Sequence, residues 1–300
     1  MAIDPAIDPA IDLKIEARWW AKEEKGARCG LCFHRCLVPA GAHGLCGVRE
    51  YDGKGKNLSS PYLGRFSSCA VDPIEKKPLY HWRPGSKIFS LGSVGCNMRC
   101  PFCQNHAISH PAGGTGSVRL LTLEPEELVA RVRDMGLSAV AWTYNEPTLQ
   151  AEYILRAAPL LKKARIAVAL VTNGMWGPEF AGELAPLLDA ANVDVKTFDA
   201  AQYSAMGGSL DVVRENVENL VRAGVHVELT NLVVPGISDS RIGFRTMVDW
   251  IAGIGPEIPL HISRYFPAYN HSAPPTDVAL MRDFAALAGQ KLTHVHLGNV

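Results

Sequence analysis

The sequence predicts an α/β protein, a partial (β/α) barrel of the TIM type preceded by a small cysteine-rich module. From about residue 87 onward, short β-rich runs alternate with amphipathic helical stretches, which indicates parallel βαβ units. About seven such runs favour a barrel or open partial barrel, although periodicity leaves a doubly wound sheet as the alternative. Before residue 85 the chain is rich in Cys, Gly and charge, so a metal is expected to hold that short segment together.

Each expected element has its own signal. Strands are expected over residues 88–91, 139–144, 166–171, 193–196, 225–229, 260–263 and 293–297, and helices over 126–135, 150–164, 210–223 and 277–287. Thr122, Pro125 and early acidic residues favour the start of the first helix. In such a barrel the chemistry lies on loops at the carboxyl ends of the strands.

We divide the chain into three parts. Residues 1–24 are a lead-in that is partly disordered or left over from a tag, residues 25–85 are a cysteine-rich module, and residues 86–300 are the barrel.

Composition narrows the possible classes of function. Lys and Arg number 30, as do Asp and Glu, so the overall charge indicates neither nucleic acid nor an anionic membrane as partner. No apolar run approaches the roughly 20 residues that span a membrane, and the start does not resemble a signal peptide. Clustered cysteines indicate metal binding in a reducing compartment, the cytoplasm.

The central cysteines carry the strongest functional signal. Cys96, Cys100 and Cys103 follow the first expected barrel strand with the spacing Cys-x3-Cys-x2-Cys. A [4Fe–4S] cluster takes one thiolate per iron, so three cysteines leave one iron open. The amino and carboxylate groups of a methionine moiety can bind that iron, which places a sulfonium beside the cluster. A structural zinc site that also uses His106 is the alternative, but the first gap of three residues and the position after a strand favour the cluster.

This spacing resembles the signature of the radical S-adenosylmethionine (SAM) superfamily, with Phe102 like its aromatic residue before the last cysteine. The segments 143–148, 172–174, 194–196 and 233–236 resemble strand-end motifs of the pyruvate formate-lyase activating enzyme group. The resemblance implies a [4Fe–4S] cluster on Cys96, Cys100 and Cys103, which act as the catalytic cysteines. It also implies a SAM site formed by Phe102, Asn145, Glu146, Thr172, Asn173, Asp194 and Lys196.

One branch is more similar still. The segments 72–81, 103–105, 263–267 and 297–299 look like the radical SAM enzymes of the AmmeMemoRadiSam system. The resemblance implies reductive cleavage of SAM to a 5′-deoxyadenosyl radical, with a ferredoxin or flavodoxin as electron donor and an unidentified small-molecule or peptide substrate. Activation of a glycyl radical protein is the alternative, and Val171 and Phe266, which replace an Asp and a His of the activators, disfavour it. An iron–sulfur electron carrier and a zinc-stapled binding module remain as other classes.

The N-terminal cysteines form a second group. Cys29, Cys32, Cys36 and Cys46 have the spacing Cys-x2-Cys-x3-Cys-x9-Cys, enough for a tetrahedral zinc site or a fully ligated auxiliary cluster. Zinc is slightly favoured, and His34 is a possible substitute ligand. Cys69 stands alone and is expected to be a buried, inert thiol.

Several other residues allow a functional and a structural interpretation. Asp194 and Lys196 alternate on an expected strand and so share a face, which suits an ion pair or the cofactor site. The run 75–77 is either solvated or directed at the site. A substrate or packing role is open for His261, Arg264 and Tyr265, whereas strand packing is expected for His294 and His296, and docking of the N-terminal segment for Trp19 and Trp20.

Overall fold

The computed structural model describes residues 16–53 and 57–300. Within them, the largest sheet has eight strands in the order β15-β14-β13-β12-β11-β10-β8-β7. Its parallel strands are β8 (Lys87–Gly92), β10 (Ala139–Trp142), β11 (Ala167–Thr172), β12 (Ala190–Asp194), β13 (His226–Val233), β14 (Leu260–Arg264) and β15 (Val295–Gly298). Because neighbours follow chain order without the reversal of a doubly wound sheet, the predicted partial barrel is confirmed.

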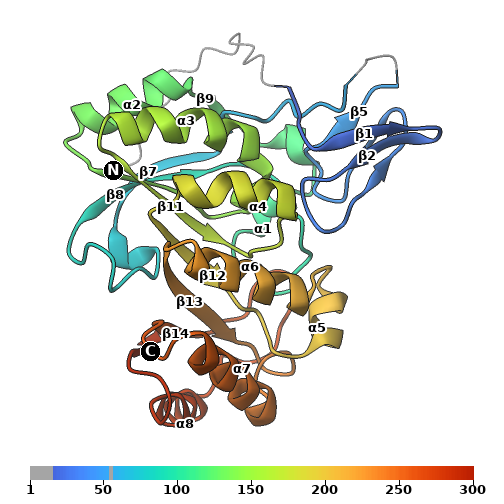
Figure 1. Cartoon of the computed structure of the whole chain (residues 1–300). Helices are drawn as coiled ribbons and strands as arrows, with labels where there is room; N and C mark the ends of the chain where they lie inside the picture. The colour runs from blue at the N-terminus through green and yellow to red at the C-terminus, as the bar shows by residue number, and fades with distance from the viewer. Residues whose placement is uncertain (1–15, 54–56) are drawn as a thin grey trace.

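Helices cover the outer face of this curved sheet (Figure 1). The helices of the described residues are α1 (His106–Ser109), α2 (Pro125–Asp134), α3 (Ala151–Lys163), α4 (Pro178–Leu184), α5 (Ala200–Ala205), α6 (Leu210–Arg222), α7 (Arg241–Ile254) and α8 (Val278–Ala288). The 3-10 turns are η1 (Ile74–Lys76), η2 (Thr115–Ser117), η3 (Pro147–Gln150) and η4 (Ala185–Leu187). All four expected helices form. α6 shows why: Ser209 accepts a hydrogen bond from the Val212 amide, and Val213, Val217 and Leu220 form a buried stripe.

The inner face of the sheet is rich in small residues at one end of the barrel. Alanines of β10, β11 and β12 pack there against Ile74 and Leu79, all of them buried. The loop that contains η1 therefore closes the amino-terminal end of the partial barrel, and the carboxyl ends of the strands are left for the site.

Two differences from the expected strands have physical causes. β12 spans Ala190–Asp194 instead of residues 193–196, because the small residues Ala190 and Ala191, which carry little β-strand signal, pair with β11 and β13. β7 (Ser68–Pro73) was not expected, and it pairs antiparallel with β8 at the sheet edge. Residues 25–85 therefore contribute one strand to the sheet that we assigned to residues 86–300.

The N-terminal segment, residues 16–53 and 57–66, lies beside α3 and α4 (Figure 1). Its short strands are β1 (Trp20–Glu23), β2 (Gly26–Cys29), β3 (Leu37–Val38), β4 (Ala42–His43), β5 (Glu50–Tyr51) and β6 (Arg65–Phe66), the last paired with β9 (Leu121–Thr122). Trp19 docks it, since its ring meets Phe180 edge-on at 5.4 Å and its Nε1 donates to Glu183. The lead-in expected over 1–24 lies outside the described residues up to residue 15. No described helix has the length and apolar character needed to cross a membrane.

Candidate active site

A cavity of about 880 Å³ opens at the carboxyl ends of the parallel strands. The lining comes from the loop after β8, from the ends of strands between β10 and β15, and from the segment between β7 and β8. All of the residues expected at the cluster and at SAM belong to this lining, namely Cys96, Cys100, Phe102, Cys103, Asn145, Glu146, Thr172, Asn173, Asp194 and Lys196. The structure thus brings together side chains that are up to a hundred residues apart in the sequence.

The three cysteines sit on a loop with a tight turn before it. Gly95 has φ of 84°, and an added Cβ would lie 2.6 Å from the Cys46 carbonyl oxygen. Burial raises the pKa of Cys96, and raises the pKa of Cys100 to about 11. Lys196 opposes this effect of burial at Cys100. A cationic metal centre would replace the protons of such thiols.

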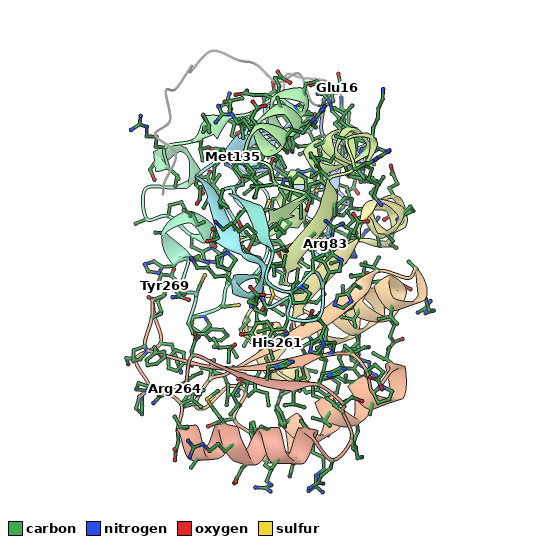
Figure 2. All side chains as sticks on the ribbon, turned by 90° about the vertical axis from the view of Figure 1, so that its left-hand side faces the viewer. Glu16, Arg83, Met135, His261, Arg264 and Tyr269 are labelled. Atoms are coloured by element: carbon green, nitrogen blue, oxygen red, sulfur yellow. The ribbon has the colours of Figure 1, made fainter. Side chains whose placement is uncertain are left out.

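The donor set fits three-cysteine ligation of a [4Fe–4S] cluster. Three thiols line the same cavity, whereas His106 is not part of the lining; its ring stacks on Tyr269 with centroids 4.8 Å apart. Tyr269 itself lies at the edge of the molecule (Figure 2). No group of three or more His, Cys, Asp or Glu side chains in residues 16–53 and 57–300 is already arranged to hold a metal ion, so the cysteine side chains must turn inward to bind one.

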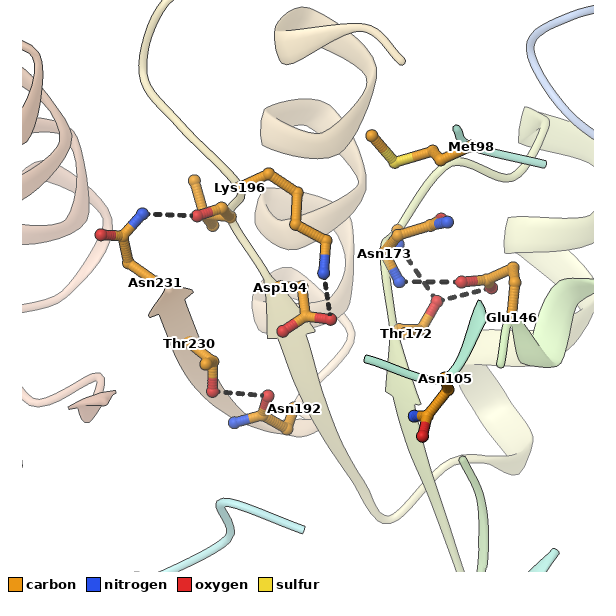
Figure 3. Close-up of polar contacts among 12 residues, drawn as sticks. Met98, Asn105, Glu146, Thr172, Asn173, Asn192, Asp194, Lys196, Thr230 and Asn231 are labelled. Atoms are coloured by element: carbon orange, nitrogen blue, oxygen red, sulfur yellow. Dashed lines mark hydrogen bonds and ion pairs between the residues drawn. The ribbon is translucent and has the colours of Figure 1, made fainter. Parts of the chain in front are cut away.

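Glu146 joins the ends of two strands. Its Oε1 accepts hydrogen bonds from the Thr148 amide at 3.0 Å, the Thr148 hydroxyl at 2.6 Å and the Thr172 hydroxyl at 2.8 Å. Its Oε2 accepts one from the Asn173 amide at 2.8 Å (Figure 3). Burial raises the pKa of Glu146, and these hydrogen bonds oppose that effect. The carboxylate is therefore held rigidly at the cavity, with its Oε2 the less occupied oxygen.

Asn145 and Asn173 connect the strand ends to the cysteine loop. Asn145 accepts from the Ser93 amide at 2.8 Å and donates to the Gly95 carbonyl at 2.9 Å. Asn173 Nδ2 lies 2.9 Å from Asn97 Oδ1 and 3.8 Å from Cys96 Sγ. These contacts fix the loop in front of the sheet.

Asp194 and Lys196 form an ion pair with the carboxylate oxygen 2.7 Å from Nζ (Figure 3). β12 ends at Asp194, so Lys196 stands two residues beyond it, and the Tyr203 hydroxyl accepts from its amide at 3.0 Å. Burial alone would lower the pKa of Lys196, but the Asp194 carboxylate outweighs burial and the pKa is raised. Lys196 is therefore a fixed positive charge in the cavity wall.

The sequence interpretation missed a network around Asp72. Its Oδ2 accepts from Lys77 Nζ at 2.7 Å and from the Tyr144 hydroxyl at 2.5 Å. Lys77 is buried, and its Nζ lies 4.2 Å from the centre of the Tyr144 ring. Burial disfavours the Asp72 carboxylate, yet Lys77 and Tyr144 overcome this and its pKa is lowered. The run 75–77 lines the cavity, and within it Lys77 is buried whereas Lys76 is exposed to solvent.

A second missed feature closes the amino-terminal end of the barrel. Glu228, fully buried on β13, accepts from the Tyr80 and His81 amides and pairs with His226 at 2.9 Å and His261 at 2.7 Å. Its pKa is lowered because these hydrogen bonds outweigh burial. An acidic residue within an expected strand, here Glu228 within residues 225–229, is the signal that identifies such a group. His261 of this group also lines the cavity (Figure 2).

The remaining candidates have structural contacts. Arg264 Nε donates to the Thr276 carbonyl at 2.9 Å, and the Tyr265 hydroxyl donates to the His271 carbonyl at 2.6 Å. Neither residue belongs to the cavity lining. His296 packs at the barrel end as expected, with its Nε2 2.8 Å from that of His81, and the His294 ring lies tilted beside that of His81 with centroids 4.2 Å apart. Burial raises the pKa of the lone Cys69 thiol to about 11.

The four N-terminal cysteines are gathered around a separate, small enclosed cavity. His34, considered as a substitute ligand, lies beside them, but its Nε2 is 2.7 Å from the Asn97 carbonyl oxygen. The side chain therefore ties the N-terminal segment to the cysteine loop of the active site.

Comparison with known proteins agrees with this geometry. The model of the radical SAM superfamily matches residues 91–244, just over half of the chain. An uncharacterized protein of Methanocaldococcus jannaschii is 32% identical over 95% of this chain and 85% of its own length. The pyruvate formate-lyase-activating enzyme of Clostridium pasteurianum is 28% identical over 53% of this chain and 67% of its own length. The GTP 3′,8-cyclase of Heliobacterium modesticaldum is 29% identical, and the match spans only half of that enzyme.

Solved structures share the fold at low sequence identity. Streptococcus suis SuiB bound to S-adenosylmethionine has a TM-score of 0.52 and 14% identity over 68% of this chain and 48% of that chain. QueE from Escherichia coli has a TM-score of 0.50 and 13% identity over 79% of this chain and 93% of that chain. The strand order, the cavity at the strand ends and the family match agree, and the chain belongs to the radical SAM superfamily.

Proposed function

We propose that this chain cleaves SAM reductively in the cavity at the strand ends, with Cys96, Cys100 and Cys103 as ligands of a [4Fe–4S] cluster. When bound, the cluster supplies the electron that breaks a carbon–sulfur bond of SAM and releases a 5′-deoxyadenosyl radical. The observation that supports the proposal is the gathering of three thiols and the polar strand ends around one cavity of about 880 Å³.

Different residues of the cavity wall suit different parts of SAM. Glu146 Oε2 suits the ammonium group of a methionine moiety, because it offers a carboxylate acceptor in the cavity wall. Asn173 Nδ2, which lies 3.8 Å from Cys96 Sγ, offers a hydrogen-bond donor beside the cysteine. Phe102 and the turn that begins at Thr172 offer surfaces for the rest of SAM. Lys196, held charged by Asp194, suits a carboxylate. A ferredoxin or flavodoxin is the proposed electron donor, and the reducing cytoplasm is the proposed location.

We propose that the substrate binds in the same cavity. Lys77, Tyr80, Thr230 and His261 belong to its lining and supply hydrogen-bonding groups. A small molecule or a peptide with polar groups fits such a surface, and loss of a hydrogen atom to the radical is the proposed reaction. Activation of a glycyl radical protein is the competing reaction. Val171, which lines the cavity without a polar group, weakens it.

The proposal is tested by SAM binding to the reconstituted cluster. We expect the anaerobically reconstituted chain to hold a reduced cluster whose electron paramagnetic resonance spectrum changes when SAM is added. Cys96→Ala should lose the cluster, whereas Cys69→Ala, which removes a thiol outside the cavity, should keep both the cluster and the spectral change. If the spectrum of the wild-type cluster did not change when SAM was added, the iron–sulfur electron carrier would be favoured instead.

A further inference from the structure

The N-terminal cysteines converge although they come from two loops. Cys29 ends β2, and its amide donates to the Cys36 carbonyl at 2.9 Å, which closes the loop that contains Cys32. Cys46 lies in the turn after β4, held by a hydrogen bond from the Gly44 amide to the Arg49 carbonyl at 2.8 Å. The four thiols and the Arg49 side chain line one enclosed cavity of about 10 Å³.

The size of this cavity favours a single ion over a cluster. A space of about 10 Å³ holds about one water-sized body. A single ion needs only rotation of the cysteine side chains, whereas a [4Fe–4S] cubane, with four irons and four sulfides, needs a much larger space. The cavity at the strand ends, where a cubane is proposed, is far larger at about 880 Å³.

The Arg49 side chain is the second observation. It is 1% exposed, and its terminal nitrogens donate to the Arg18 carbonyl at 3.1 Å and to both oxygens of Glu152 at 2.5 and 2.7 Å. Its Nε is buried and has no partner. A buried donor without an acceptor is costly, and Arg49 belongs to the wall of the cavity that the four cysteines line.

We propose that Cys29, Cys32, Cys36 and Cys46 bind one Zn²⁺ ion as a tetrahedral tetrathiolate, and that Arg49 positions and neutralises it. Four thiols lose their protons to solvent, four zinc–sulfur bonds form, and no electron is transferred. The product carries two negative charges. The positive guanidinium of Arg49 partly offsets these negative charges, and its Nε–H donates a hydrogen bond to a thiolate sulfur. As the structure stands, the thiols are not yet arranged around an ion, so binding requires rotation of the cysteine side chains.

This site lies against the active-site loop. His34 holds the Asn97 carbonyl, Arg99 donates to the Leu45 carbonyl, and Gly95 packs on the Cys46 backbone. The bound ion therefore has a structural role, because it fixes the surface on which the loop with Cys96 rests. The inference does not depend on SAM cleavage.

The test uses the full chain with Cys96→Ala, Cys100→Ala and Cys103→Ala together, so that bound metal reports on the N-terminal cysteines. We expect one zinc per chain, with four sulfur neighbours at about 2.3 Å by X-ray absorption. We also expect cobalt titration to give a thiolate charge-transfer band and the intense visible bands of a tetrahedral site. Adding Cys32→Ser should abolish tight binding, and adding Cys69→Ser should not. Absence of cobalt binding, or iron and sulfide with a cluster spectrum after reconstitution, would overturn the inference.

The role of Arg49 needs a separate variant, because its removal alone leaves Glu152 buried without a counter-ion. Arg49→Met combined with Glu152→Gln removes both charges. We expect zinc affinity to fall roughly 10- to 100-fold in a competition titration with a chelator, while Glu152→Gln alone leaves the affinity close to that of the parent chain. Equal affinity in the double variant and its parent would show that Arg49 does not act on the ion.

Discussion

Glu152→Gln tests how firmly the N-terminal segment is joined to the barrel. Glu152 of α3 and Arg49 of the N-terminal segment form an ion pair at 2.5 Å, and their side chains are 2% and 1% exposed. The substitution leaves the guanidinium charged and buried without its counter-ion. Breaking such a buried pair by removing one partner costs about 3–5 kcal/mol of the free energy of unfolding.

A matched surface pair serves as the control. Arg18 and Glu183 of α4 also join the two parts at 2.8 Å, but their side chains are 49% and 41% exposed. Glu183→Gln should therefore cost less than about 1 kcal/mol. Urea unfolding of the reduced, metal-free chains, followed by circular dichroism and tryptophan fluorescence, compares the two. If Glu152→Gln were no more destabilising than Glu183→Gln, the buried pair would not hold the segment in place.

Three further predictions concern the site and its supports. Asp194→Asn should lower the pKa of Lys196, because burial then acts without the carboxylate. Reductive methylation of Lys196 should therefore become faster at a fixed, mildly alkaline pH. An unchanged rate would contradict the pairing of Asp194 with Lys196. Glu228→Gln should be most destabilising near neutral pH, because the lowered pKa of Glu228 means that its contribution is present above about pH 4.5 and is lost as the pH falls. Unfolding curves at several pH values check this, and a difference independent of pH would refute it. Gly95→Ala should lower the yield of folded protein and its iron content more than Gly41→Ala does. Both glycines have positive φ, but only the Cβ added at Gly95 meets neighbouring atoms. Equal effects of the two substitutions would show that the close approach at Gly95 is unimportant.

The barrel was predictable because its strands and helices carry regular signals. Runs such as Ala139–Trp142 are buried throughout, and α6 has both a cap and an apolar stripe. The edge strand β7 was missed because Ser68–Pro73 mixes polar and apolar residues, and its order comes from pairing with β8. α7 was missed although Ser240 caps it and its buried residues Phe244, Met247, Val248 and Ile251 have the spacing of an amphipathic helix.

The residues of the site were predictable only where they belong to a motif that resembles a known family. The resemblance named residues that the fold then places around one cavity. The contacts of Lys77 and Tyr144 with Asp72 depend on the path of β7 and on a backbone at Tyr144 with φ of 71°. Glu228 meets His261 only across paired strands. Such contacts arise from tertiary structure, and no local pattern in the sequence specifies them.

The central claim is reductive SAM cleavage that depends on the three cysteines of the strand-end cavity. The most direct measurement is 5′-deoxyadenosine formed by the anaerobically reconstituted chain with SAM and dithionite, compared with Cys96→Ala and Cys69→Ala. The account predicts product from the wild-type chain and from Cys69→Ala, and none above background from Cys96→Ala. An intact cluster that gives no product, even with a flavodoxin or ferredoxin as reductant, or product that survives Cys96→Ala, would contradict it.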